Sequence, residues 1–187
     1  MNTFPLFFKL EDHKVLIVGG GDVALRKADL LRRAGAAITI LAPTISAEIQ
    51  ALLSHTKDKA KHELIYENYN QAYMTGARVI IAATDDEALN HQIHADASEL
   101  NIPVNVVDTP HLCDFIFPAI VDRNPIVIGI SSYGKAPVLA RLLRARLETL
   151  IPQGYGKLAK LAGDIRNDVK TKIPTLTGRR QFWERAF

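Results

Sequence analysis

The stretch Lys14-Val-Leu-Ile-Val-Gly-Gly-Gly-Asp-Val-Ala24 joins an apolar run to three glycines and then to a helical pattern. The apolar run predicts a buried strand, and Gly19 allows the tight turn after it. Gly21 lets a ligand approach the backbone, and the small Ala24 lets the helix pack close to the strand. The start of the helix presents free N–H groups and a partial positive charge at that point. This layout is typical of a turn that binds the pyrophosphate of a dinucleotide.

Strand and helix patterns alternate over the first 107 residues. Strands connected by helices predict right-handed crossovers and a Rossmann-like parallel sheet of the α/β class. The polar, basic stretch 54–61 is predicted to be a surface loop. Strands are predicted at 14–18, 37–41, 63–66, 78–83 and 103–107, and helices at 22–34, 45–53 and 87–100.

The pattern changes after residue 110. Two apolar runs, 115–117 and 126–130, are joined through Asp122-Arg-Asn-Pro125, which has strong turn chemistry and predicts an antiparallel hairpin. A two-stranded hairpin is marginal alone, so we expect a homodimer built on this region. Three helices follow, at 138–150, 156–172 and 177–187. The predicted division is a nucleotide-binding domain at 1–112, a dimerisation region at 113–150 and a small helical domain at 151–187.

Composition limits the class of protein. The chain has 187 residues, of which 48% are apolar and 23% charged, as in soluble globular proteins. No apolar run approaches the roughly 18 residues of a membrane span, and the N-terminus lacks a secretory signal pattern. A single cysteine, Cys113, permits no internal disulfide, which fits a reducing cytoplasm. We therefore expect a cytoplasmic protein.

Charge is distributed unevenly along the chain. Residues 1–136 hold 12 Lys and Arg against 16 Asp and Glu, whereas residues 137–187 hold 11 against 4. The basic C-terminal quarter is either a solvated helical surface or a site for a polyanion, such as an acidic small molecule or nucleic acid. Basic residues are not interleaved with aromatic ones along a strand, so nucleic acid is the least favoured partner.

The segments after the second and third long apolar runs are candidates for further cofactor contacts. The acidic residue that usually holds the adenosine ribose is missing from Ile40-Leu41-Ala42-Pro43, and no arginine there favours a 2′-phosphate. Ribose recognition would then use backbone or Thr44, which can also cap the next helix. Asp22 is predicted to be a helix cap or ribose contact. For Thr84-Asp85-Asp86, a nucleotide contact and a helix cap through Asp85 remain alternatives.

Polar residues also follow the last predicted parallel strand. Asp108 ends the sequence Asn105-Val-Val-Asp108 and could exchange protons with a substrate, although its residue type alone favours a turn. Cys113 is interpreted as a small buried hydrophobe, because its spacing to Asp108 and His111 matches no metal site. We predict no metal ligands.

A second candidate anion site precedes the helix at 138–150. The loop Ser131-Ser-Tyr-Gly-Lys-Ala-Pro137 brings hydroxyls, a glycine and Lys135 to a helix N-terminus. Arg141 and Arg144 lie three residues apart on one face of that helix. Ordinary capping and solvated arginines are the alternative interpretation.

Taken together, six segments resemble the precorrin-2 dehydrogenase/sirohydrochlorin ferrochelatase module of siroheme synthase. The resemblance covers essentially the whole chain, in order and at the expected spacings. The segments are 4–8 (Phe-Pro-Leu-Phe-Phe), 15–24, 82–86 (Ala-Ala-Thr-Asp-Asp), 105–108, 115–119 (Phe-Ile-Phe-Pro-Ala) and 137–144 (Pro-Val-Leu-Ala-Arg-Leu-Leu-Arg).

The resemblance implies NAD⁺-dependent oxidation of precorrin-2 to sirohydrochlorin, with Fe²⁺ insertion in bifunctional members, and a homodimer. It implies that Asp108 serves both the oxidation and the metal insertion, so Asp108 is interpreted as a catalytic candidate and not as a turn residue. The basic residues would contact the carboxylates of the tetrapyrrole. The candidate NAD contacts are Gly19, Gly20, Gly21, Asp22, Val23, Pro43, Thr44, Thr84 and Asp85. The candidate substrate contacts are Asn105, Ser131, Ser132, Lys135, Arg141 and Arg144.

The chain departs from the family pattern in the loop that precedes residue 137. Many members carry Ser-Ser-Gly-Gly-x-Ser-Pro there, whereas this chain has Tyr133 in place of a glycine and Ala136 in place of a serine. The alternative functions are a non-catalytic NAD- or tetrapyrrole-binding module and a dehydrogenase of another small acid. No membrane partner is expected.

Overall fold

In a computed structural model, the described residues are 3–54 and 60–187. The chain forms two compact units, Met1–Ile116 and Phe117–Phe187, which we describe separately. The predicted loop at 54–61 lies largely outside the described residues. The division into three domains at 112 and 150 stays a prediction.

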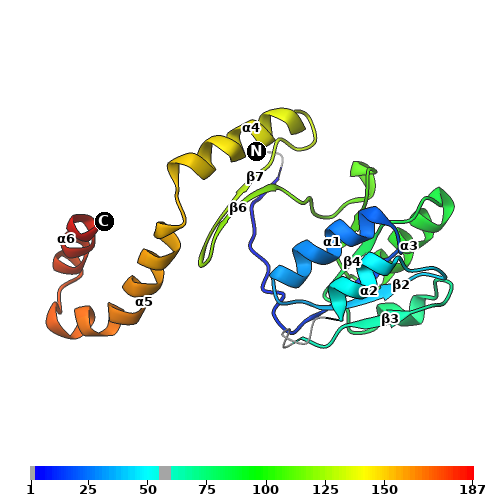
Figure 1. The fold of residues 1–187 in the computed structure, drawn as a ribbon, viewed down its shortest axis with the longest axis horizontal. Coiled ribbons are helices and arrows are strands. Elements are labelled where there is room, and N and C mark those ends of the chain that lie inside the picture. Colours follow the sequence, from blue (N-terminus) through cyan, green and yellow to red (C-terminus); the bar gives the residue numbers. More distant parts are fainter. Residues whose placement is uncertain (1–2, 55–59) are drawn as a thin grey trace. The chain divides into compact units, whose positions relative to one another are not determined.

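The first unit is built on a five-stranded parallel sheet (Figure 1). Its order is β3-β2-β1-β4-β5, so the chain moves from β1 to one side and then returns to the other side through β4. The predicted Rossmann-like α/β class is therefore confirmed. The strands are β1 (Lys14–Val18), β2 (Ala37–Leu41), β3 (Glu63–Ile65), β4 (Val79–Ala82) and β5 (Val104–Val106), and the helices are α1 (Asp22–Arg33), α2 (Ala47–Leu53) and α3 (Glu87–Glu99), with short 3-10 helices η1 (Gln71–Met74) and η2 (Pro110–Leu112).

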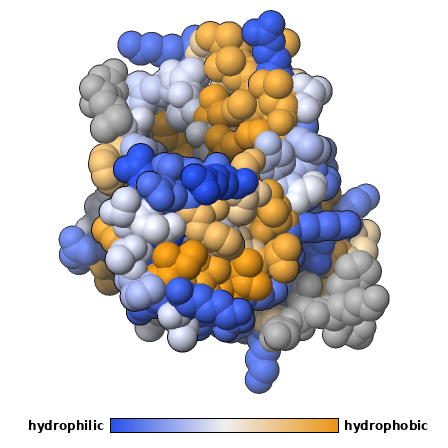
Figure 2. All heavy atoms as spheres, turned by 90° about the vertical axis from the view of Figure 1, so that its left-hand side faces the viewer, coloured by the Kyte–Doolittle hydropathy of each residue, from blue (hydrophilic) through white to orange (hydrophobic). Residues whose placement is uncertain are grey.

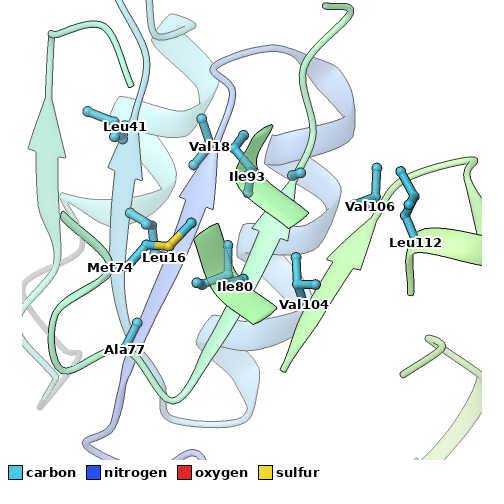
Figure 3. Close-up of a cluster of buried hydrophobic side chains, with 12 residues drawn as sticks. Leu16, Val18, Leu41, Met74, Ala77, Ile80, Ile93, Val104, Val106 and Leu112 are labelled. Carbon is cyan, nitrogen blue, oxygen red and sulfur yellow. The ribbon is translucent and has the colours of Figure 1, made fainter. Parts of the chain in front are cut away.

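The central strands are apolar on both faces, as a sheet covered on two sides requires. One face packs against Ile93 and Ala97 of α3 and forms the cluster in Figure 3. Because strand side chains alternate between faces, residues between these positions, such as Asn105, lie on the opposite face. The cluster comprises Leu16, Val18, Leu41, Met74, Ala77, Ile80, Ala82, Ile93, Ala97, Val104, Val106 and Leu112.

The carboxyl ends of the strands lie at one edge of the sheet, and backbone hydrogen bonds hold the loops that leave it. The Gly19 amide donates to the Leu41 carbonyl at 3.0 Å, and the Ala83 amide to the Val18 carbonyl at 2.8 Å. The amide of Val107 donates in the same way to Ala82 at 3.0 Å. Strand order reverses between β1 and β4, and ligands of such sheets bind at this switch point.

Two predicted helix caps are wrong by one or two residues. The second helix starts at Ala47, and Ser46 caps it by accepting a hydrogen bond from the Ile49 amide at 3.3 Å, so Thr44 does not cap it. Asp86 caps α3 by accepting from the Leu89 amide at 3.0 Å, so Asp85 does not. In both cases several capping residue types lie side by side, and composition alone does not choose among them.

The second unit contains the hairpin of β6 (Ala119–Arg123) and β7 (Ile126–Ile130), followed by α4 (Pro137–Leu150), α5 (Gly154–Lys172) and α6 (Leu176–Ala186). The antiparallel pairing is confirmed, but the first strand was predicted at 115–117 and lies at 119–123. Pro118 has no N–H group to donate to the ladder, so pairing begins only after it. The chain reverses at Asn124-Pro125.

Arg123 connects the hairpin to the helices that follow. It is only 8% exposed, and its guanidinium donates to the carbonyls of Ile151 at 2.6 Å and Glu148 at 3.1 Å. Those carbonyls belong to the end of α4, where a cation is favourable. A Cβ at Gly156 would overlap the Arg123 carbonyl, so the start of α5 packs directly on the turn.

The helices of the second unit expose many apolar side chains. Within α4 only Ala140 is buried. Figure 2 shows hydrophobic patches between hydrophilic side chains on the face that carries the C-terminal helices. The exposed apolar residues of α4, α5 and α6 are Val138, Leu139, Leu142, Leu143, Leu150, Tyr155, Leu158, Leu161 and Leu176. Such surfaces mark sites of protein contact. Among the described residues, no helix combines the length and apolar character of a membrane span.

Candidate dinucleotide-binding and catalytic site

Gly19 and Gly20 pack three loops of the first unit together. Gly19 has φ +127°, and a Cβ there would overlap the carbonyl of Ala83 after β4. A Cβ at Gly20 would overlap the carbonyl of Thr44 after β2, and the Gly20 carbonyl accepts from the Ser46 amide at 2.9 Å. Both positions therefore require glycine for backbone packing, independently of any ligand.

Gly21 differs from its two neighbours because it faces open space. A Cβ there would meet no atom within 4 Å. Gly21 is the N-cap of α1 and supplies no side chain, so the predicted capping role of Asp22 is wrong: Asp22 is the exposed first residue of the helix. The N–H groups of the first turn have no partner within the helix. An open glycine beside them is the cradle that a pyrophosphate needs, so the residues present fit a dinucleotide.

The segment after β2 places Pro43 and Thr44 beside the glycine turn. Both side chains are exposed, whereas Ala42 and Ile45 are buried. The contact between Gly20 and the Thr44 carbonyl brings this segment to the switch point. Contacts of Pro43, Thr44, Asp22 and the half-buried Val23 with NAD stay predictions.

Asn90 organises the loop after β4 and was missed by sequence reasoning. The Thr84 hydroxyl lies 2.8 Å from Asn90 Oδ1, and Asn90 Nδ2 donates to the Thr84 carbonyl at 2.9 Å. Asn90 is buried with Ile93 and Ala97 on the inner face of α3, and a polar residue in that stripe was the available signal. The Thr84 side chain is thereby fixed, and Asp85 stays exposed beside it.

Asn105 and Cys113 stabilise the loop that follows β5. Buried Asn105 donates to the Phe115 carbonyl at 2.8 Å, and its Nδ2 lies 3.4 Å from the Cys113 sulfur. The Cys113 thiol donates to the Val106 carbonyl at 3.0 Å, and burial raises its pKa. Cys113 is therefore half-buried and hydrogen-bonded, which corrects its interpretation as a plain hydrophobe. Contact of Asn105 with a substrate stays a prediction.

Asp108 lies two residues beyond β5, at the same edge of the sheet as the glycine turn. Its backbone has φ +58°, in the left-handed region that Asp tolerates better than most residues, and its side chain is exposed. Strands β1 and β5 are separated by β4 alone, so about 10 Å of sheet lies between the two features. A carboxylate at this place can accept a proton from a bound ligand.

Lys27 of α1 was also missed by sequence reasoning. It is half-buried, and burial lowers the pKa of its amine, while the Asp108 carboxylate acts in the opposite direction. A lysine in a helix with an alternating charge pattern gives no sequence signal for such a position. The Asp108 carboxylate therefore acts on the charge of the Lys27 amine.

The predicted substrate residues of the second unit surround the start of α4. The Ser131 hydroxyl accepts from the Tyr133 amide at 3.1 Å, and Ser132 accepts from the Ala136 amide at 3.0 Å. Tyr133 adopts φ +54°, the conformation that glycine would occupy more easily. Lys135, Arg141 and Arg144 are exposed, and Arg144 lies 3.8 Å from the Glu148 carboxylate. Their substrate contacts stay predictions.

A family model described as putative NAD(P)-binding matches residues 6–119, more than half of the chain. The chain belongs to this family. The match ends at the start of β6 and so includes the whole parallel sheet. The cofactor type predicted from the glycine turn is thereby supported by an independent comparison. A second model, described as the sirohaem synthase dimerisation region, matches residues 154–187. This match lies C-terminal to the stretch 113–150 on which dimerisation was predicted.

Curated relatives align with the chain from end to end. A siroheme synthase of Psychrobacter arcticus is 86% identical over all 187 residues, and one of Pseudomonas putida is 52% identical. The chain covers 33% and 39% of those two proteins. The predicted resemblance to siroheme synthase is confirmed, and the chain spans about a third to two-fifths of the length of these relatives.

A solved structure described as SirC, precorrin-2 dehydrogenase, has the same fold. The TM-score is 0.67 over 98% of both chains, at 23% sequence identity. At this identity, the likeness supports the architecture alone. Among residues 3–54 and 60–187, no group of three or more His, Cys, Asp and Glu side chains is arranged to hold a metal ion.

Proposed function

We propose that this chain oxidises precorrin-2 to sirohydrochlorin with NAD⁺, as part of a siroheme synthase. The observation that carries the proposal is the end-to-end identity of 86% with a siroheme synthase. The arrangement of the first unit supports it, because a dinucleotide turn and an exposed carboxylate lie at one edge of the sheet. NAD is favoured over NADP since no arginine follows β2 at residues 42–46.

The residues divide the chemistry between two loops. The oxidation removes one hydride and one proton from precorrin-2, and bound NAD⁺ would supply the hydride acceptor. Asp108 accepts the proton from the ring carbon or nitrogen that becomes unsaturated. Gly21 and the first turn of α1 bind the pyrophosphate, and Pro43 and Thr44 contact the adenosine half. The other half of the dinucleotide then lies towards β4 and β5, on the side of Asp108.

The second reaction is metal insertion, with Fe²⁺ as substrate. Two pyrrole N–H protons leave as the metal enters the ring, and Asp108 accepts them. The serines at 131 and 132 and the cations Lys135, Arg141 and Arg144 hold the acidic substrate. The protein acts as a homodimer, which the match of residues 154–187 to a dimerisation region and the exposed apolar surface of α4 and α5 support.

Anaerobic incubation with precorrin-2 and NAD⁺ tests the proposal. NADH absorbance should rise together with the spectrum of sirohydrochlorin, and subsequent addition of Fe²⁺ or Co²⁺ tests insertion separately. Asp108→Asn should lower turnover by about 10²–10⁴-fold, the usual contribution of a general base, while NAD affinity is kept. A binding module would bind both ligands and form no NADH, which would refute the proposed oxidation.

A further inference from the structure

Two histidine side chains lie close together on the surface of the first unit. His91 belongs to α3 and His111 to the short helix η2, and their ring centroids are 6.4 Å apart, with the ring planes inclined at 49°. Both side chains are exposed, so solvent and small ions can reach them. The two residues are far apart in the sequence, so the fold creates the pair and no ligand-spacing motif reveals it.

Buried neighbours fix the backbone under both histidines. Ile93, two residues after His91, and Leu112, directly after His111, belong to the same buried apolar cluster. The Leu112 amide also donates to the Thr109 carbonyl at 3.0 Å. The two histidines therefore stand on rigid supports, while their exposed rings can rotate about the side-chain bonds.

The spacing of the rings suits two imidazoles that share one metal ion. A zinc–nitrogen bond to histidine is about 2.0–2.1 Å long, so two rings on one ion at a tetrahedral angle have centroids about 5 Å apart. From the observed 6.4 Å, side-chain rotation has to bring the rings only about 1 Å closer. Imidazole is a good ligand for divalent iron, nickel, copper and zinc.

The sequence around the pair carries negative charges and no positive ones. Residues 79–116 contain seven Asp and Glu but neither lysine nor arginine, although the whole chain has 23 basic against 20 acidic residues. A local excess of one sign of charge raises the concentration of the opposite ions at that surface. The expected ligand is therefore a cation. The exposed acidic residues of this segment are Asp85, Asp86, Glu87, Glu99, Asp108 and Asp114.

A site with two protein ligands suits a metal ion that is passed on. In the part of the chain that the structure describes, no group of three or more His, Cys, Asp and Glu side chains is arranged to hold a metal ion, so water would fill the remaining positions. Structural metal sites are closed by four protein ligands, whereas sites that exchange ligands keep open positions. The histidine pair therefore fits a substrate metal better than a permanent cofactor.

We propose that His91 and His111 bind a divalent transition-metal ion and load the metal for insertion into the tetrapyrrole. The loading rests on the metal insertion proposed above, whereas the binding does not. His111 follows Asp108 by three residues, so their Cα atoms are at most about 11 Å apart. The ion is thus held close to the carboxylate that accepts the pyrrole protons.

Isothermal titration of the tag-free, ligand-free protein with Co²⁺ alone tests the binding. One ion should bind per chain, and His91→Gln and His111→Gln should each weaken its Kd at least about tenfold, since even loss of a residue that only supports a metal ligand costs that much. His13→Gln is the matched control, because His13 is an exposed histidine before β1, at the opposite end of the strands. A wild type without saturable binding, or a Kd that both substitutions leave unchanged, would overturn the site.

Thermal unfolding of the same samples gives a second readout. An ion that binds the folded protein raises its Tm, so Co²⁺ should raise the Tm of the wild type and of His13→Gln more than that of either variant of the pair. Equal increases in all four proteins would show that the ion binds elsewhere. If a glutamine variant does not fold, His91→Ala or His111→Ala takes its place in both measurements.

Insertion kinetics with sirohydrochlorin and Co²⁺ test the loading. His91→Gln and His111→Gln should raise the KM for Co²⁺ at least about tenfold more than the KM for sirohydrochlorin, as expected from the loss of affinity. An unchanged KM for Co²⁺ would overturn the loading. A wild type that binds Co²⁺ through the pair but inserts none would instead refute the proposed insertion and leave the metal site supported.

Discussion

The three glycines after β1 have different roles, so substitutions at them should change the stability of the protein and its affinity for NAD⁺ independently. Gly21→Ala introduces one methyl group at a position with φ −98°, which alanine adopts without strain, and with no atom within 4 Å of the new Cβ. We expect the free energy of unfolding to change by less than about 1 kcal/mol, as for compatible Gly→Ala changes. The methyl group projects into the space in front of the first turn of α1, where the pyrophosphate would lie.

The loss of affinity follows from the contacts that the methyl group blocks. Hydrogen bonds between backbone N–H groups and a charged acceptor contribute about 1.5–3 kcal/mol each, so losing one of them corresponds to roughly a tenfold to hundredfold weaker Kd. Isothermal titration with NAD⁺ measures the affinity, and thermal unfolding of the same samples measures the stability.

Gly19→Ala is the matched comparison. Its φ of +127° is disfavoured for alanine, and the new Cβ would overlap the Ala83 backbone carbonyl, so the loop after β4 must move. We expect a loss of about 3 kcal/mol or more in stability, from backbone strain and overpacking together. If Gly21→Ala binds NAD⁺ as tightly as the wild type, or if Gly19→Ala is as stable as Gly21→Ala, the assignment of these glycines is wrong.

Three further predictions concern the two units separately. Arg123→Met should lower the free energy of unfolding by about 3 kcal/mol, because the two carbonyls at the end of α4 lose a charged donor. The exposed Arg180→Met control should change it by less than about 0.5 kcal/mol, and urea titration measures both. Burial and the hydrogen bond to Asp96 raise the pKa of Tyr69 above its ordinary 10.0. Above pH 10.0 the unfolded chain therefore loses this proton while the folded protein keeps it, so the free energy of unfolding should fall. Tyr69→Phe should remove that part of the pH dependence in thermal unfolding. Arg144→Ala should raise the KM for precorrin-2 more than that for NAD⁺, because its surface pair with Glu148 contributes little to stability; equal effects in steady-state kinetics would refute a substrate contact.

The sheet could be predicted from the sequence because its signals are strong and redundant. Each central strand is an apolar run with glycine or a helix pattern directly after it, and an error of one residue at either end does not change the order. The glycine turn is equally specific, because Gly19 and Gly20 are required by backbone contacts to Ala83 and Thr44. These contacts join segments far apart in the chain, but the glycines reveal them locally.

Residues that act through side-chain contacts between distant segments were missed. Lys27 and Asn90 are single polar residues in helices, where the usual interpretation is a solvated position. The loop that Asn90 holds and the burial of Lys27 are specified only by the packing of α3 and α1 on the sheet. The helix caps failed for a related reason, since Thr44 and Ser46, or Asp85 and Asp86, are chemically equivalent until the backbone direction is known.

The two halves of the candidate site are therefore stabilised by different interactions. The cofactor half depends on backbone atoms: two glycines that cannot be replaced, one open glycine and the N–H groups of a helix. The catalytic half depends on side chains, since Cys113 and Asn105 hold the loop that carries Asp108. Substitutions after β5 can thus change the chemistry without disturbing cofactor binding, whereas substitutions at Gly19 or Gly20 disturb the fold first. A variant that loses turnover but still binds NAD⁺ is expected from changes at Asp108, and not from changes at Gly19 or Gly20.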